Sequence, residues 1–175
     1  MNRNLNNIVH NDSRPSETSY RRHLTVQYCN GNGVDIGSGG RPVVPWAIQV
    51  ENCQDARIDN HTINYIGDAL NLPFKDQTLD FVYASHLLED FLDWKPVLDE
   101  WNRVLKPGGR IIIMVPDRVI FRRCVENGQD DNLAHKHESY PGELTQFYKN
   151  NYPNFYIICD YITDSYNILF IAKKT

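Results

Sequence analysis

The chain has 175 residues, 41% hydrophobic and 23% charged, which suits one globular domain and excludes a wholly disordered chain. Its formal net charge of -4 offers no strongly basic field, so we expect neither DNA nor an anionic membrane as a partner. No apolar run approaches the ~20 residues of a membrane span and no signal-type segment opens the chain, so we expect a cytoplasmic location.

The four cysteines lie far apart in the sequence and form no CxxC pair. This spacing disfavours a zinc knuckle, and free thiols fit a reducing compartment.

The chain reads as a short arm followed by one domain. Residues 1–18 are polar and lack hydrophobic periodicity, which predicts a flexible N-terminal arm before a domain at 19–175 that opens with a short helix at 19–29. From Gly33 on, short apolar runs alternate with helical patterns or loops, which is typical of an α/β domain. The runs assigned to strands are 34–36, 47–50, 63–66, 79–83, 110–115, 155–161 and 167–172.

Two helices are expected between the fourth and fifth strands. Apolar residues at helical spacing over 87–92 predict the first. Pro96 forbids one uninterrupted helix, so a second is expected to start after Asp93 as its N-cap, with its apolar face at 97–105. Residues 106–109, Lys-Pro-Gly-Gly, end it.

The last two strands are separated by only a short turn, which predicts an antiparallel hairpin at the sheet edge. The preceding residues 116–141 are expected to form a loop over the mouth of any site. The predicted fold is therefore a Rossmann-like, doubly wound, seven-stranded, mostly parallel sheet with a C-terminal antiparallel hairpin, in a single domain.

Polar and glycine residues follow three consecutive strands. The first strand leads into Gly37-Ser38-Gly39-Gly40, a turn that lets a ligand approach the backbone closely. Glu51 closes the second strand, where a carboxylate can accept both hydroxyls of a ribose. Asp68 follows the third, where it can accept from an exocyclic adenine amine. The order glycine turn, acid, acid predicts a nucleoside-binding crevice at the carboxyl ends of the strands.

Three segments carry a resemblance to a known family. VDIGSGG, GDALNLPFKDQTLDFVYASHLLED and EWNRVLKPGGRIIIMVPD together resemble the class I S-adenosylmethionine-dependent methyltransferases, in particular the small type 11-like group. AHKHESYPGEL is similar to that group's segment before the final hairpin.

The resemblance implies S-adenosylmethionine as cofactor and a small-molecule acceptor. It implies that Asp35, Gly37, Ser38 and Gly39 line the methionine part. Glu51 would hold the ribose, and Asp68, Ala69 and Leu70 the adenine. Ser85 and His86 would face the sulfonium and the substrate, with His86 as the candidate general base. The alternative for His86 is a histidine that holds the turn after the fourth strand through backbone hydrogen bonds.

The sequence departs from the family pattern at four places. Arg41 stands where a third glycine is usual, and the short segment 41–46 leaves the first crossover helix short or absent. Asn52 replaces a residue that often packs on adenine, and Asp90 stands where histidine is frequent.

Other polar and aromatic residues have two interpretations. His135 and His137, beside Glu138, form either part of a polar loop or, with a further ligand, a metal site. Three arginines of the 116–141 loop can meet an anionic acceptor or form a solvated face. Aromatic residues can stack on a substrate, but Trp94 and Trp101 are expected in the core. The arginines are Arg118, Arg122 and Arg123, and the remaining aromatics are Trp46, Tyr83 and Tyr140.

Three functions compete on this sequence. The first is methyl transfer to oxygen or nitrogen of a small-molecule or sugar-containing acceptor. The second is a non-catalytic methyltransferase-like binding module that acts through a partner. The third is a nicotinamide-dependent oxidoreductase, but Arg41, Pro42 and Pro45 spoil the long helix that its glycine fingerprint opens.

Overall fold

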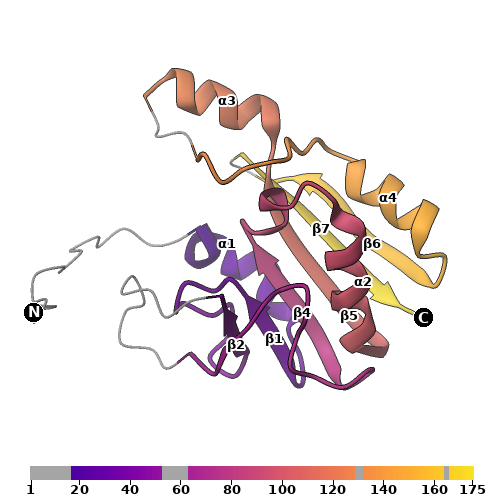
Figure 1. The fold of residues 1–175 in the computed structure, drawn as a ribbon. Coiled ribbons are helices and arrows are strands. Elements are labelled where there is room, and N and C mark those ends of the chain that lie inside the picture. The colour runs from indigo at the N-terminus through magenta and orange to yellow at the C-terminus, as the bar shows by residue number, and fades with distance from the viewer. Residues whose placement is uncertain (1–16, 53–62, 129–131, 164–165) are drawn as a thin grey trace, which may run out of the picture.

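A computed structural model describes residues 17–52, 63–128, 132–163 and 166–175 of the chain (Figure 1). One seven-stranded sheet runs through it, in the order β3-β2-β1-β4-β5-β7-β6. Neighbours among β1 to β5 pair in parallel, and β7 pairs antiparallel with both β5 and β6. The predicted mostly parallel sheet with a C-terminal antiparallel hairpin is confirmed. The strands are β1 (Gly33–Ile36), β2 (Ile48–Glu51), β3 (Tyr65–Ile66), β4 (Leu79–Ser85), β5 (Leu105–Pro116), β6 (Phe155–Ile162) and β7 (Asn167–Lys174).

Helices cover the two faces of the sheet unequally (Figure 1). The helices α2 (Trp94–Val104) and α4 (Glu143–Asn151) pack on one face with most of the buried apolar residues. The opposite face is covered by α1 (Glu17–Thr25) and the 3-10 helix η1 (Val26–Tyr28). No helix lies between β1 and β2, where Val43, Val44 and Ala47 are buried against this face instead. The short crossover expected from the sequence is therefore an irregular segment.

The helix α2 forms as its sequence predicts. The carboxylate of Asp93 accepts from the N–H of Lys95 at 2.9 Å, and Pro96 stands in the first turn, where no intrahelical donor is lost. The buried side chains lie on one side of the helix, and both Trp94 and Trp101 belong to the core. The helix ends at Val104, just before the Lys-Pro-Gly-Gly segment.

Two expectations about helices are wrong. The apolar spacing over 87–92 forms only a 3-10 turn, η2 (Leu88–Asp90), because β4 continues to Ser85 and α2 is already capped at Asp93. Too few residues remain between them for a stable α-helix. The segment 116–141, expected as a loop, contains α3 (Arg118–Glu126), which Asp117 caps through the N–H groups of Val119 and Ile120.

The N-terminal arm predicted at 1–18 falls almost wholly outside the described residues, and α1 begins at Glu17. Residues 164–165, at the tip of the expected hairpin turn, also lie outside them. Among the residues that are described, no helix is long and apolar enough to cross a membrane.

Candidate cofactor cavity and acceptor side

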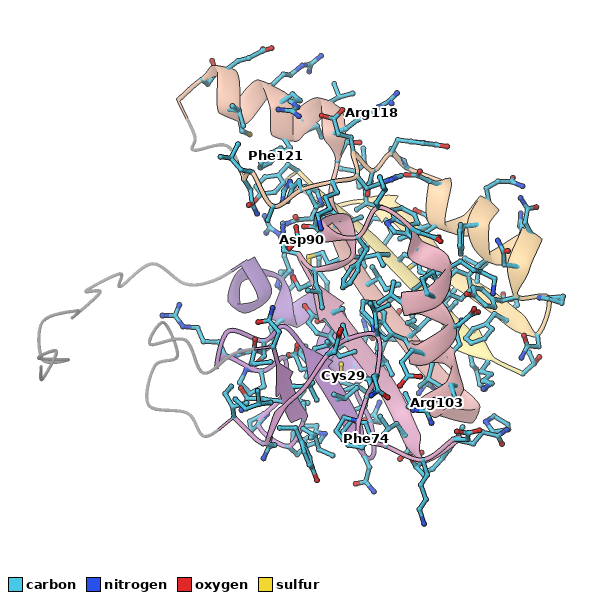
Figure 2. All side chains as sticks on the ribbon, in the orientation of Figure 1. Cys29, Phe74, Asp90, Arg103, Arg118 and Phe121 are labelled. Carbon is cyan, nitrogen blue, oxygen red and sulfur yellow. The ribbon has the colours of Figure 1, made fainter. Side chains whose placement is uncertain are left out.

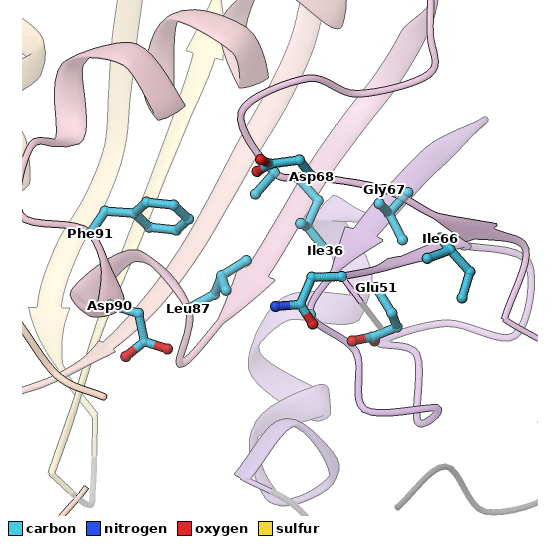
Figure 3. A pocket seen from close by; sticks show the side chains of 12 residues that line it. Ile36, Glu51, Ile66, Gly67, Asp68, Leu87, Asp90 and Phe91 are labelled. Carbon is cyan, nitrogen blue, oxygen red and sulfur yellow. The ribbon is translucent and has the colours of Figure 1, made fainter. Parts of the chain in front are cut away.

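A cavity of about 510 Å³ opens at the carboxyl ends of the central strands (Figure 3). Volumes of this size are usual for small-molecule sites. In the close-up, Leu87, Asp90 and Phe91 stand on one side of it, and Glu51, Ile66 and Asp68 on the other. The cavity therefore joins the end of β4 to the ends of β2 and β3, across β1. The remaining residues of its lining are Ile36, Gly37, Val50, Asn52, Gly67 and Ala69.

The glycine turn forms the floor beside β1. Gly37 has φ +73°, and its N–H donates to the carbonyl of Val50 at 2.9 Å. A Cβ atom at this position would lie 3.3 Å from Leu87 Cδ2 in addition to the backbone strain. Glycine therefore lets the chain turn while the side chain of Leu87 closes over it.

Glu51 connects the glycine turn to β2. Its Oε1 accepts from Ser38 Oγ at 2.8 Å and from the N–H of Gly39 at 2.7 Å. Its carbonyl accepts from the N–H of Gly67 at 2.8 Å, which ties β2 to the residues after β3. Ser38 and Gly39 thus lie behind Glu51 and hold its carboxylate, while Glu51 itself lines the cavity.

Asp68 and Ala69 line the cavity, but the structure directs Leu70 elsewhere. The carboxylate of Asp68 accepts from the N–H of Leu70 at 2.9 Å, which closes a local turn. The side chain of Leu70 is 42% exposed and is not part of the lining. The carbonyl of Ala69 accepts a hydrogen bond of 3.0 Å from the indole N–H of Trp101.

Asp35 lies on the other face of the sheet. Side chains alternate along a strand, so Asp35 points away from the side on which its neighbours Val34 and Ile36 pack. Its Oδ2 accepts from the N–H of Val43 at 2.6 Å, and its side chain is buried outside the cavity lining. Asp35 therefore packs against the irregular segment that connects β1 to β2.

Burial raises the pKa of Asp35 well above its ordinary value, with a further contribution from the charge of Glu51 and an opposing one from the N–H of Val43. Between 3.8 and that raised value the folded protein binds more protons than the unfolded chain, so stability falls as pH rises through this window. We expect Asp35→Asn, which keeps an oxygen for Val43, to lose less stability than the wild type between about pH 5 and about pH 7.5. Urea unfolding at the two pH values measures this, with Asp76→Asn at an exposed carboxylate as the control. If the free energy of unfolding fell equally in the wild type and in Asp35→Asn, a raised pKa of Asp35 would be contradicted.

The end of β4 carries the most strained residue of the site. His86 has φ +55°, in the left-handed region that non-glycine residues seldom adopt, and its N–H donates to the carbonyl of Met114 at 2.9 Å. The predicted site residues Ser85 and His86 do not line the large cavity. Ser85 Oγ and Asp90 Oδ1 are buried without a hydrogen-bond partner among the described residues, so a ligand donor can satisfy them.

Sequence reasoning missed the apolar wall formed by Leu87 and Phe91, because it interpreted their spacing only as the signal of a helix. It also treated Asp90 only as a departure from the family pattern. One signal could have identified Leu87, Asp90 and Phe91 as lining residues. They follow closely after a strand that ends at the crevice.

The two loop histidines have different surroundings. His137 Nε2 lies 2.8 Å from Glu143 Oε1, and its ring packs against Trp94 with centroids 4.3 Å apart. His135 Nε2 lies 3.5 Å from Glu89 Oε1. Within the described ranges, no three His, Cys, Asp or Glu side chains are grouped so as to hold a metal ion.

The other residues with two interpretations are spread over the surface and the core. Tyr83 is fully buried, and Trp46 is 56% exposed and does not line the cavity described above. Arg118 lies over the ring of Tyr140 at 5.3 Å from its centroid, and Arg122 pairs with Glu138. Arg123 lines an open cavity along α3 together with Arg118 and Arg122.

Part of the chain is similar in sequence to known methyltransferases. Residues 33–113 match the family model of the methyltransferase domain. A demethylmenaquinone methyltransferase of Staphylococcus saprophyticus is 41% identical over 70 residues, 38% of this chain and 30% of the relative. An uncharacterized protein of Methanocaldococcus jannaschii is 36% identical over 107 residues, 58% of this chain and 50% of the relative. The matches thus span half or less of these curated relatives.

The fold recurs in solved methyltransferase structures. A SAM-dependent methyltransferase from Thermotoga maritima superposes with a TM-score of 0.66 at 21% identity, covering 89% of each chain. The fold expected from the sequence is confirmed, and residues 33–113 match a methyltransferase-domain model, in agreement with the resemblance drawn from the sequence.

Proposed function

We propose, from the match of residues 33–113 to the methyltransferase-domain model, that this protein transfers a methyl group from S-adenosylmethionine to oxygen or nitrogen of a small-molecule or sugar-containing acceptor. The cavity at the ends of β1 to β4 carries this proposal, because it combines a backbone turn, apolar walls and three carboxylates. In this proposal Glu51 accepts the ribose hydroxyls and Asp68 accepts the adenine amine, since both carboxylates line the cavity. Ile36, Ile66 and Phe91 supply apolar surface for the base.

S-adenosylmethionine supplies an electrophilic methyl group, so transfer breaks the methyl–sulfur bond, forms one C–O or C–N bond and releases one proton. The protein's task is to align the acceptor with the methyl group and to take the proton. The name of the Staphylococcus relative concerns demethylmenaquinone, but the match covers only 30% of that protein. It therefore supports the class of reaction and leaves the acceptor to experiment.

Calorimetric titration of the purified protein with S-adenosylmethionine, S-adenosylhomocysteine and NAD tests the proposal. We expect micromolar binding of the two sulfur compounds and no binding of NAD. Binding of NAD alone would support the oxidoreductase instead. Cofactor binding without product over a broad acceptor panel would favour the binding module that acts through a partner.

Asp90 is expected to discriminate the charged cofactor from its neutral product. Burial raises the pKa of Asp90, as does the charge of Glu89, while His135 and Lys136 oppose the shift. Above that raised pKa, its carboxylate attracts the sulfonium of S-adenosylmethionine, a charge that S-adenosylhomocysteine lacks. We expect Asp90→Asn to lower the affinity for S-adenosylmethionine relative to S-adenosylhomocysteine by about threefold. The ratio of the two calorimetric dissociation constants measures this, and an unchanged ratio would place Asp90 away from the sulfonium.

A further inference from the structure

A buried carboxylate lies between two histidines beside the proposed cofactor cavity. The side chain of Glu89 is fully buried in η2, and its Oε1 lies 3.4 Å from His86 Nδ1 and 3.5 Å from His135 Nε2. Neither oxygen of Glu89 has a hydrogen bond of normal geometry among the described residues. Burying a carboxylate costs free energy unless opposite charge or a donor faces it. The two imidazole rings are the groups placed to do so, and hydrogen bonds of a catalytic site often shorten only when ligands bind.

Backbone hydrogen bonds hold this arrangement in place. The N–H groups of Lys136 and His137 donate to the carbonyl of Glu89 at 2.9 and 3.0 Å. His137 is anchored in turn to α4 through Glu143. The segment that carries His135 is thereby fastened directly over η2.

The remaining neighbours of the cluster come from several segments of the chain. The charges of Glu89 and Lys136 both act on Asp90, the next residue of η2. The ring of Tyr166, just before β7, meets the ring of His86 with centroids 5.8 Å apart. Phe121 of α3 lies 5.1 Å from the ring of His135 and 5.8 Å from that of Tyr166. These aromatic contacts restrict both imidazoles, so their orientation relative to Glu89 is determined by packing.

We propose that Glu89 is a positioning residue that fixes the tautomers of His86 and His135. An ionised carboxylate only accepts hydrogen bonds, so the ring nitrogen that faces it carries a proton, Nδ1 in His86 and Nε2 in His135. In the neutral rings, Nε2 of His86 and Nδ1 of His135 are then the proton acceptors. This inference rests on the proposed function, because methyl transfer to an O–H or N–H group releases a proton. Of the two rings, that of His135 lines a cavity where an acceptor can bind, whereas Nε2 of His86 is buried.

His135 indicates where the methyl acceptor binds. His135 forms part of the wall of a separate cavity of about 170 Å³, with Pro116, Phe121 and Leu133 as apolar lining and Arg118 as a cation. Figure 2 shows α3, with Phe121 and Arg118, on the same side of the molecule as Asp90. Glu89 thus lies between Asp90, which lines the cofactor cavity, and His135, which lines this small, partly aromatic cavity. The fitting acceptor class is a small ring compound with a hydroxyl or N–H group.

Long-range ¹H–¹⁵N spectra of the uniformly labelled protein at about pH 8.5, where an ordinary histidine is neutral, test the tautomers directly. His86→Asn and His135→Asn assign the two rings. We expect His86 as the Nδ1–H tautomer, the minor form of free histidine, and His135 as Nε2–H. Glu89→Gln replaces the pure acceptor by an amide that also donates, so we expect His86 to revert to Nε2–H. Glu126→Gln, at an exposed carboxylate of α3, is the matched control and leaves both tautomers unchanged.

The wild-type spectrum alone can overturn the proposal, whatever the folding of the variant. His86 as Nε2–H in the wild type, or as Nδ1–H in a folded Glu89→Gln variant, would contradict a positioning role for Glu89. Calorimetric titration of the same samples with S-adenosylhomocysteine tests the proposed function separately. We expect Glu89→Gln to bind it within about threefold of the wild type. If the wild type did not bind S-adenosylhomocysteine, the proposed methyl transfer would be overturned. The tautomers of His86 and His135 would still test the role of Glu89.

Discussion

Replacing Trp101 by alanine is expected to lower the free energy of unfolding by about 3–5 kcal/mol, the usual cost of deleting a large buried aromatic side chain. Trp101 is fully buried on α2, among the residues that join this helix to the sheet. Its indole N–H also donates to the carbonyl of Ala69. The substitution therefore opens a cavity and leaves a backbone acceptor beside the proposed cofactor site without its donor.

Two variants separate these contributions. Trp101→Phe keeps most of the packing and loses the hydrogen bond, so we expect a loss of about 1–3 kcal/mol. Trp46→Ala is the matched control, because that side chain is 56% exposed, and we expect its effect to stay within about 0.5 kcal/mol. Urea unfolding followed by far-ultraviolet circular dichroism measures all three without relying on tryptophan fluorescence. If Trp101→Ala lowered the free energy of unfolding by less than about 1 kcal/mol, Trp101 would not be a main contact between α2 and the sheet.

Glu51→Ala is expected to weaken binding of S-adenosylhomocysteine at least tenfold, about 1.4 kcal/mol. The carboxylate closes β2, lines the cavity, and is held in place by Ser38 Oγ and the N–H of Gly39. Its removal deletes the acceptor for the ribose hydroxyls and also releases the glycine turn. Calorimetric titration measures the loss, and unchanged affinity would remove Glu51 from the site.

The direct and indirect parts of this effect can be separated. Ser38→Ala leaves the carboxylate but removes one of the two donors that hold it, so we expect a smaller loss than in Glu51→Ala. If Ser38→Ala reproduced the full loss, the role of Glu51 would be to hold the turn. Glu51→Gln keeps one acceptor oxygen, and we expect an intermediate affinity.

Much of the fold follows from local signals in the sequence. Short apolar runs bounded by glycine, proline and polar residues define all seven strands, although β3 is only Tyr65–Ile66. Asp93 and Pro96 define where α2 begins. The hairpin of β6 and β7 follows from the short separation of two apolar runs. These signals are local because they depend on side-chain period and on the dihedral preferences of single residues.

The candidate site was predicted only in part. The glycine turn, Glu51 and Asp68 meet at one cavity because the ends of parallel strands share one edge of the sheet. Asp35 does not join them, because a strand directs successive side chains to opposite faces. Alternation with the apolar Val34 and Ile36 predicts this side for Asp35, whereas the family resemblance places it in the site.

The sequence by itself thus determined the number of strands, their approximate positions along the chain and the acids at their ends, but not their order in the sheet. The tertiary structure decided that 87–92 form a turn, that 118–126 form a helix, and that His86, Glu89 and His135 converge. The physical reason is sequence separation. His135 reaches Glu89 only because backbone hydrogen bonds join η2 to a segment 47 residues further on, between Glu89 and Lys136. No local pattern encodes such a contact, whereas periodicity and capping are properties of neighbouring residues.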